Sequence, residues 1–275
     1  MIGRKDAIKL LGLPESNFDN YFKNSCEVEG FKVKNRWMFD EEALMRWDRL
    51  RKERTVTLSL DEYKKCFEFA IKMAYGSKSS HGTGIRGARS EVQVADDFIL
   101  GILAEEGVAK FLRERFGVEI GLDHEAHPGQ ITAQDFVSIS DGGGTREVKI
   151  DVAVKSSKMK SCFNIIPPAE YEREGRKSDI YIFARVGLPS DHLFRILRDH
   201  SFFRKTSDFL ESAEGYRKIE ELVDIPVWTC GFSYHNEFEK VGEIPNQNFD
   251  GYRYALSVAK MHNSDRDWEN LVSRL

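Results

Sequence analysis

The sequence predicts an α/β fold in which a mixed sheet is flanked by helices and preceded by a small, mostly helical unit. Two segments, Asp179–Val186 and Ile225–Phe232, have the apolar, β-branched and aromatic composition of buried strands. A charged segment of helical character, from His192 to Leu222, separates them. Strands that alternate with helices require a sheet covered by those helices, because each element must bury its apolar side.

The composition is that of a soluble globular protein with one large or two modest domains. The chain has 275 residues, of which 41% are hydrophobic and 31% are charged. No apolar run approaches the roughly 18 residues of a membrane helix, and no secretory signal is present, so we expect neither membrane association nor export. The four cysteines lack CxxC spacing, which favours reduced thiols in a cytoplasmic protein and argues against a zinc site.

Residues 1–55 are predicted to form the small N-terminal unit. Helical spacing indicates a first helix over Arg4–Leu11, which a Gly-Leu-Pro turn ends. A second helix over Ser16–Phe22 and a third over Asp40–Leu50 each begin at a residue suited to N-capping. Between them, Phe31–Phe39 alternates enough to form a β-wing.

This order of elements resembles the helix-turn-helix of excisionase-like and MerR-like proteins, which implies binding to double-stranded DNA. The net charge of −4 gives no overall nucleic-acid signature, so DNA contacts must come from a local basic surface. The expected contacts are basic, aromatic and amide side chains of the wing and second helix: Lys32, Lys34, Arg36, Trp37, Asn17 and Asn20. The alternative is a helical packing or dimerisation module, because short helix-turn-helix patterns are common in helical segments.

Residues 56–87 are interpreted as a connector. Leu58–Tyr75 predicts a helix with Ser59 as its N-cap, serving as a connector or a dimer helix. The stretch Gly76–Gly87 is rich in glycine and serine and carries Arg86. It could close on a phosphate backbone, since glycine lets the main chain approach closely, or it could be a plain linker.

Residues 88–275 are predicted to form the larger domain, which starts with a long helix or a broken pair of helices. Apolar residues recur at helical spacing over Ala88–Phe116, and Gly107 is the expected break. Three histidines, His192, His200 and His235, lack paired spacing and are expected to be structural or surface residues.

A β-hairpin is predicted over residues 131–155, with its turn at Asp141–Gly144. Folding the chain at the glycines places Asp135 opposite Ile150 or Asp151, and Glu147 opposite Ser138. Asp135 shares a face with apolar residues of its own strand, where a lone carboxylate is costly to bury. A divalent metal and a lysine on the second strand would supply the missing cation; the alternative is an amphipathic hairpin whose charges are only solvated.

Three features of this hairpin carry a resemblance to the PD-(D/E)xK nuclease superfamily, most of all to type II restriction endonucleases. Asp135 stands at the start of the hairpin, Asp151 lies on the second strand, and Lys155 follows and is itself followed by two serines. The family pattern would place an acid at position 153, which here is Ala153. An alternative pair, Glu147 with the lysine at position 149, has the literal acid-x-Lys spacing but lies nearer the turn.

The resemblance implies a restriction-endonuclease-like core and a Mg²⁺-dependent endodeoxyribonuclease that cuts double-stranded DNA at a short specific site as a homodimer. Asp135 and Asp151 would hold the metal, with Glu91 from the helix before the hairpin. Lys155 would position the attacking water or stabilise the pentavalent phosphorus. The alternative for Glu91 is an acid that only stabilises a helix N-terminus.

Two further lysines follow the hairpin, Lys158 and Lys160, and are suited to holding a phosphodiester near the metal. A second class of function stays open at this point. The chain could be a non-catalytic DNA-binding transcriptional regulator, with the larger domain as a sensor.

Overall fold

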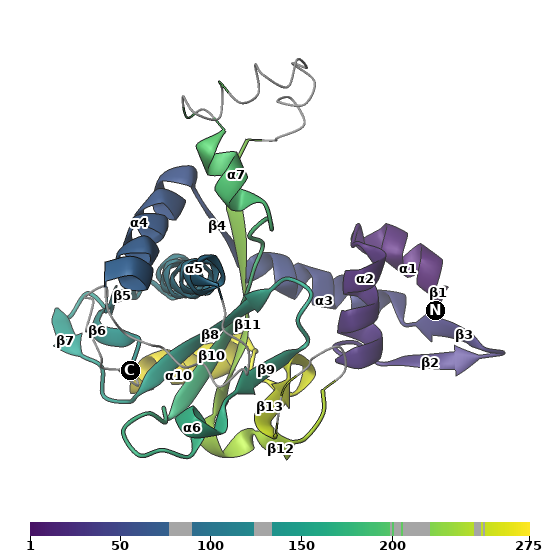
Figure 1. Cartoon of the computed structure of the whole chain (residues 1–275). Coiled ribbons are helices and arrows are strands. Elements are labelled where there is room, and N and C mark those ends of the chain that lie inside the picture. Colours follow the sequence, from purple (N-terminus) through teal and green to yellow (C-terminus); the bar gives the residue numbers. More distant parts are fainter. Residues whose placement is uncertain are drawn as a thin grey trace.

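A four-stranded mixed sheet forms the centre of the protein (Figure 1). The computed structural model describes residues 1–76, 90–123, 134–198, 200, 205, 221–244, 249 and 251–275. The sheet contains, in spatial order, β4 (Thr55–Leu58), β11 (Ile225–Tyr234), β10 (Ile180–Val186) and β8 (Val152–Lys158). β8 and β10 are parallel, and the other neighbours are antiparallel. The α/β class, the mixed sheet and the two buried strands are therefore confirmed.

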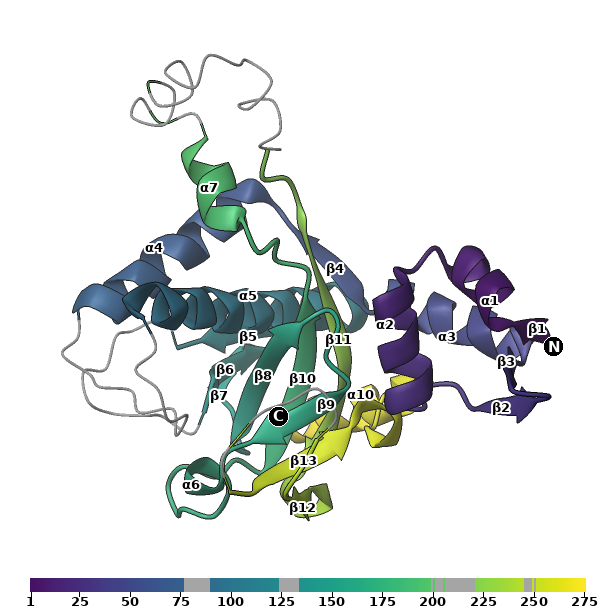
Figure 2. The ribbon, with the colours of Figure 1, turned by 45° about the vertical axis from the view of Figure 1, so that its right-hand side comes forward.

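Helix α5 (Glu91–Phe116) lies across one face of this sheet (Figure 2), with α4 (Leu60–Gly76) packed beside it. The predicted break at Gly107 is wrong, because α5 is continuous. A Cβ atom at Gly107 would lie 2.4 Å from Cγ1 of Val227 on β11, so the glycine lets the helix approach the sheet closely. The C-terminal helix α10 (Asp265–Arg274) adds Trp268 to the same hydrophobic cluster.

The helices on this face are also joined by a buried polar chain. His192, at the start of α7 (His192–Leu197), lies 2.6 Å from the Tyr63 hydroxyl through Nδ1 and 2.7 Å from the Asp96 carboxylate through Nε2. These three residues belong to α7, α4 and α5, and His192 is buried. His192 is therefore a structural residue, as expected, and the chain of hydrogen bonds fixes the three helices relative to one another.

Two smaller sheets flank the central one. The first contains β12 (Glu239–Val241), β13 (Arg253–Ser257) and β9 (Phe163–Ile166), and the second contains β5 (Glu119–Leu122), β6 (Phe136–Ser140) and β7 (Thr145–Glu147). The short helices are α6 (Pro168–Tyr171), η2 (His235–Glu237) and η3 (Val258–Lys260).

The N-terminal unit lies to one side of the core (Figures 1 and 2). Its elements are β1 (Ile2–Gly3), α1 (Arg4–Leu11), α2 (Glu15–Asp19), the π-helix η1 (Asn20–Asn24), β2 (Gly30–Val33), β3 (Arg36–Phe39) and α3 (Glu41–Glu53). The first helix, the wing and the third helix are confirmed, and Asp40 caps α3 through a 2.7 Å bond from the Ala43 amide. The second helix is corrected: Pro14, not Ser16, occupies the N-cap, and helical structure continues to Asn24.

The N-terminal unit is attached to the core through a fully buried ion pair. Arg185 of β10 donates to Glu27 at 2.6 Å, and their side chains are 0% and 3% exposed. The guanidinium lies between two aromatic rings, 4.2 Å from the centroid of Tyr21 and 4.4 Å from that of Trp228. Trp47 of the same unit also donates to Glu27, and its ring contacts Trp228 of β11, so the N-terminal unit packs against the core.

The connector assigned to residues 56–87 is corrected by the structure where it is described. β4 is an edge strand of the central sheet, paired with β11. Helix α4 begins with the predicted Ser59 cap and contributes Tyr63 and Cys66 to the main hydrophobic cluster. Residues 55–72 are therefore part of the core, because apolar side chains from Val56 to Ala70 are buried in the main hydrophobic cluster. The glycine-rich stretch, including Arg86, lies outside the described residues.

Candidate active site

Asp135 lies where β6 meets the edge of the central sheet. Its amide donates to the carbonyl of Val152 at 2.9 Å, and its Oδ2 accepts a hydrogen bond from the amide of Val154 at 2.6 Å. The carboxylate is thus held against β8, which is an edge strand. Burial raises the pKa of Asp135, an effect that the charge of Lys155 and the Val154 amide only partly offset.

The hairpin that was expected to contain Asp135 differs from the prediction. β6 lies between β5 and β7, and its register with β7 places Ser138 opposite Glu147, as predicted. The chain then leaves that sheet, and β8 joins the central one beside β10. Asp135 therefore contacts Val152 and Val154, which follow the predicted partners Ile150 and Asp151 in the chain. The difference arises because two strands, β7 and β8, replace the single predicted one.

Lys155 is located on β8 and forms an ion pair with Glu170 of α6, with Nζ 2.5 Å from Oε1. Burial alone lowers the pKa of Lys155, but the negative charges of Glu170 and Asp135 outweigh it and the net shift is upward. The side chains of Lys155 and Glu170 are 26% and 25% exposed, so the pair is half-buried and still reaches solvent.

Glu105 on α5 completes the group. Its pKa is raised well above the ordinary range, first by burial and next by the negative charge of Asp135, while Lys155 acts in the opposite direction. β8 has no neighbouring strand on its outer side. A helix on each face of the sheet can therefore place a carboxylate beside it. We refer to Glu105, Asp135, Lys155 and Glu170 as the carboxylate–lysine cluster.

Two predicted metal ligands are not part of this cluster. Asp151 is exposed, and its amide donates to Oδ2 of Asp179 at 3.0 Å. The pKa of Asp151 is raised by burial and by the charge of Asp179, with no contribution from Asp135 or Lys155. Glu91 is the first residue of α5, about 21 Å along the helix axis from Glu105. The side chain of Glu91 lies outside the described residues.

The alternative acid–lysine pair also lies elsewhere. Glu147 is an exposed residue of β7, and Lys149 is exposed beyond it, with its amide donating to the carbonyl of Leu275 at 3.1 Å. Neither residue contributes to the pKa shifts of Asp135 or Glu105. Among the described contacts, none joins Asp151 to Lys155 or Glu147 to Lys149, and the ion-pair partner of Lys155 is Glu170.

Sequence reasoning missed Glu105 and Glu170. A signal for Glu105 is present, because it lies midway between Ile102 and Val108, which are both buried on one side of α5. A carboxylate at such a position must face something other than solvent alone. Glu170 has no comparable signal, since it belongs to a four-residue helix that follows two prolines and meets Lys155 only through the tertiary fold.

The donor chemistry of the cluster fits a hard divalent cation. Its three carboxylates offer only oxygen ligands, which Mg²⁺ and Ca²⁺ prefer. Burial is the main cause of the raised pKa values of Glu105 and Asp135, and neighbouring negative charges add to it. Within the ranges that the structure describes, no three His, Cys, Asp or Glu side chains form a ready-made metal cage.

The residues predicted to contact DNA occupy two separate surfaces. On the wing, Lys32 lies 5.3 Å from the Trp37 ring centroid, and the turn residues Lys34 and Asn35 have positive φ angles of 48° and 62°. Arg36, next to the turn, is exposed.

The second surface lies at the end of β8, beside the carboxylate–lysine cluster. Lys158 is half exposed and lies 3.8 Å from Asp96, and Lys160 is exposed on the loop that follows. The Lys160 carbonyl accepts a hydrogen bond from Asn20 of the N-terminal unit. That contact places the predicted second-helix residue against the core.

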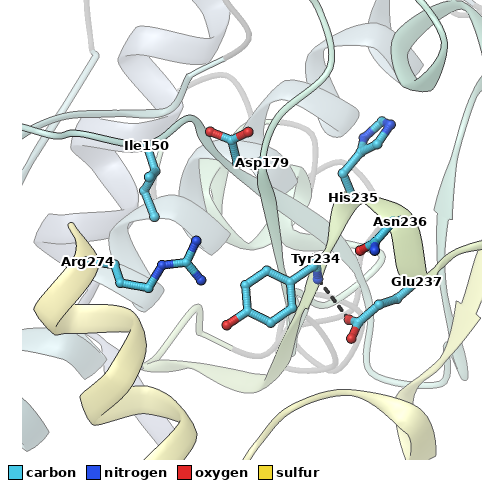
Figure 3. Close-up of a pocket in the computed structure, with 7 residues that line it drawn as sticks. All are labelled: Ile150, Asp179, Tyr234, His235, Asn236, Glu237 and Arg274. Carbon is cyan, nitrogen blue, oxygen red and sulfur yellow. Dashed lines mark hydrogen bonds between the residues drawn. The ribbon is translucent and has the colours of Figure 1, made fainter.

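A pocket of about 640 Å³ lies on another part of the core, near the ends of β8 and β10 where these strands begin (Figure 3). Arg274 points into it beside Tyr234, with Asp179 on the opposite wall. The pocket contains no member of the carboxylate–lysine cluster. Asp151 is linked to this pocket instead, through its hydrogen bond to Asp179.

Comparisons of the chain with protein-family models, curated proteins and solved structures found no match. A search of the described helices for a segment long and apolar enough to cross a bilayer also found none.

Proposed function

We propose that the protein is a Mg²⁺-dependent endodeoxyribonuclease that hydrolyses phosphodiester bonds in double-stranded DNA. The observation that carries this proposal is the position of Asp135 and Lys155 at edge strand β8, where the Val154 amide holds Asp135, Glu170 pairs with Lys155, and the charges of Asp135 and Lys155 both act on Glu105. An acid before a short strand, a lysine on the next long strand and a glutamate from the preceding helix are the parts that the resemblance to PD-(D/E)xK nucleases implies. In this proposal Glu105 takes the role first given to Glu91.

Glu170 supplies a carboxylate near Lys155, whereas the sequence lacks the acid that the family pattern places at Ala153. The family pattern places an acid two residues before the lysine, where this chain has alanine. Glu170 brings a carboxylate to within 2.5 Å of Lys155 from α6. We propose that Glu105, Asp135 and Glu170 hold the metal, with Glu170 in the place of the missing acid.

Bound Mg²⁺ would polarise the scissile phosphate and lower the pKa of an attacking water. The chain's own residues do the rest. Lys155, once Glu170 turns toward the metal, has an ammonium free to orient that water and to stabilise the charge that develops on the phosphate oxygens. The Val154 amide keeps the Asp135 carboxylate directed at β8 while substrate binds.

Lys158 and Lys160 lie beyond Lys155 on the same strand and the loop after it, so they would contact the phosphate backbone near the reacting bond. The wing would add contacts from Lys32, Lys34 and Arg36. We further propose that cleavage occurs at a short specific site by a homodimer, as the resemblance to type II restriction endonucleases implies.

The experiment is cleavage of supercoiled plasmid and of long linear DNA by the full-length protein, with Mg²⁺ or with EDTA. We expect discrete fragments with Mg²⁺ and none with EDTA. Lys155→Ala and Glu170→Gln should lose activity, whereas the matched exposed variants Lys149→Ala and Glu147→Gln should retain it. Activity that survives in Lys155→Ala would refute the assignment of the cluster.

A different outcome would favour the regulator alternative, which the observed wing supports. In that case no divalent metal would produce cleavage, while a specific duplex would still bind and variants of the wing would weaken binding.

A further inference from the structure

A small pocket of about 70 Å³ lies between the N-terminal unit and the core, and no member of the carboxylate–lysine cluster lines it. Trp47 and Arg54 line it from α3 and the residue after that helix, and Trp228, Cys230 and Asn263 line it from the core. A water molecule requires about 10–15 Å³ of such space. The cavity therefore has room for about five waters or for one oxyanion of phosphate size.

Arg54 is the unusual residue of this cavity. It is 5% exposed, and its Nη2 atom is buried without a hydrogen-bond partner. Burial is the main cause that lowers the pKa of Arg54. A buried guanidinium stays charged, so leaving it without a counterion or acceptor is costly.

The acids near Arg54 each lie within ion-pair distance of another arginine. Asp265 and Glu53 are the carboxylates that act most on Arg54, yet both pair with Arg115, at 2.9 Å and 3.6 Å. Glu27, which also lines the cavity, is bound by Arg185. In the part of the chain that the structure describes, no carboxylate lies within ion-pair distance of the Arg54 guanidinium.

We propose that this cavity is a binding site for a small free oxyanion such as inorganic phosphate, with Arg54 as its principal ligand. Asn263 also lines the cavity and can donate through its amide, and Arg51, another lining residue, pairs with Asp48. The buried position of Nη2 excludes the backbone phosphate of a DNA duplex. The site does not depend on the nuclease proposal.

Occupancy of the site would strengthen the attachment of the N-terminal unit. Arg54 belongs to the segment that leads from α3 into β4, whereas Asn263 belongs to the segment before α10. An anion held by both side chains joins the two parts of the molecule. Because only the folded protein has the cavity, binding must raise the stability of the folded state.

The test is thermal unfolding of the full-length protein over a phosphate series, with NaCl used to keep the ionic strength constant. We expect Tm to rise by roughly 3 °C when phosphate is ten times its Kd, and calorimetry to show saturable binding. Arg54→Met should weaken phosphate binding at least tenfold. Arg49→Met, an exposed arginine of the same helix, is the matched control and should bind phosphate like the wild type.

A second variant keeps the proposal testable if Arg54→Met fails to fold. Asn263→Asp would place a carboxylate on the cavity wall, where it supplies the countercharge for Arg54 and repels an anion. We expect this variant to be more stable than the wild type without phosphate and to lose the response to it. A wild-type response no larger than that to NaCl, or an equal response in Asn263→Asp, would overturn the proposal.

Discussion

Two groups of buried charge in this protein differ in how completely they are balanced. Glu27 and Arg185 form a one-to-one pair with 0–3% exposure, and hydrogen bonds or aromatic rings surround both members. The carboxylate–lysine cluster instead has three acids for one lysine and remains partly open to solvent. The first group closes an interface, whereas the second has more carboxylates than its single lysine can pair with.

This difference separates a structural charge from one available for chemistry. Burying a charge costs several kcal/mol unless a partner and hydrogen bonds compensate for it, as they do for Arg185. Acids that keep raised pKa values lower the stability of the folded state at neutral pH. Such a cost is typical of functional sites. Removing a charge from the Glu27–Arg185 pair should therefore lower stability, whereas removing a carboxylate from the carboxylate–lysine cluster should raise it.

The largest effect on stability should come from Glu27→Gln. Removing this charge leaves Arg185 buried without a counterion, which typically costs about 3–5 kcal/mol. Urea unfolding would measure the loss. Glu15→Gln, which removes the exposed partner of Arg4, is the control and should cost less than about 1 kcal/mol. Equal losses in the two variants would show that the buried pair has no special role.

Asp135→Asn should change stability in the opposite direction to Glu27→Gln, and it should also reduce cleavage. We expect cleavage to fall by about 10²- to 10³-fold, because a ligand for the developing charge is lost. We also expect the metal-free protein to become slightly more stable, because one of the like charges around Glu105 is removed. Single-turnover cleavage and Tm, measured on the same preparation, provide the check. A variant that loses both activity and stability would indicate a structural role for Asp135.

The buried acids of the carboxylate–lysine cluster should also make stability depend on pH. Because the pKa values of Glu105 and Asp135 are raised, the folded state binds more protons than the unfolded state, and stability falls as pH rises through the two values. The loss of stability is complete at pH values above the raised pKa values of the folded state. It is absent at pH values below the ordinary carboxyl range. Glu105→Gln should flatten this part of the profile and raise Tm at pH 7 by roughly 2–4 °C without metal.

Much of the fold was predictable because its signals are local. The buried strands β10 and β11 have continuous apolar composition, and the caps Asp40 and Ser59 lie three residues before the amides or acids that complete them. Gly107 misled the prediction because glycine usually interrupts a helix. Here its missing side chain serves helix–sheet contact, which no local pattern reveals.

The site was predictable only in part. Asp135 could be found because a carboxylate in an apolar strand is anomalous, and Lys155 because it follows in the next strand. Asp151 was chosen by assuming one long hairpin, but the chain changes sheets between β7 and β8 and turns Asp151 outward. Glu170 could not be predicted from local patterns, because it contacts Lys155 only in the folded protein. The two residues lie fifteen positions apart, one on a strand and the other in a four-residue helix.

The smallest predicted effect concerns the wing. Lys34→Ala should reduce affinity for duplex DNA only a few-fold and make the salt dependence shallower by about one phosphate contact, since each contact releases about one counterion. Binding measured over a salt series with Ca²⁺ replacing Mg²⁺ would test this. An unchanged slope would assign the N-terminal unit to packing, the role that its buried ion pair already supports.

The most direct test of the central claim is divalent-metal binding measured by calorimetry, without DNA and independently of cleavage. The wild-type protein should bind Mg²⁺ or Ca²⁺, and Asp135→Asn should lose at least tenfold in affinity. Asp151→Asn, which removes a nearby acid outside the carboxylate–lysine cluster, should bind like the wild type. Metal binding that survives in Asp135→Asn and disappears in Asp151→Asn would contradict the account and move the site to the pocket that Asp179 lines.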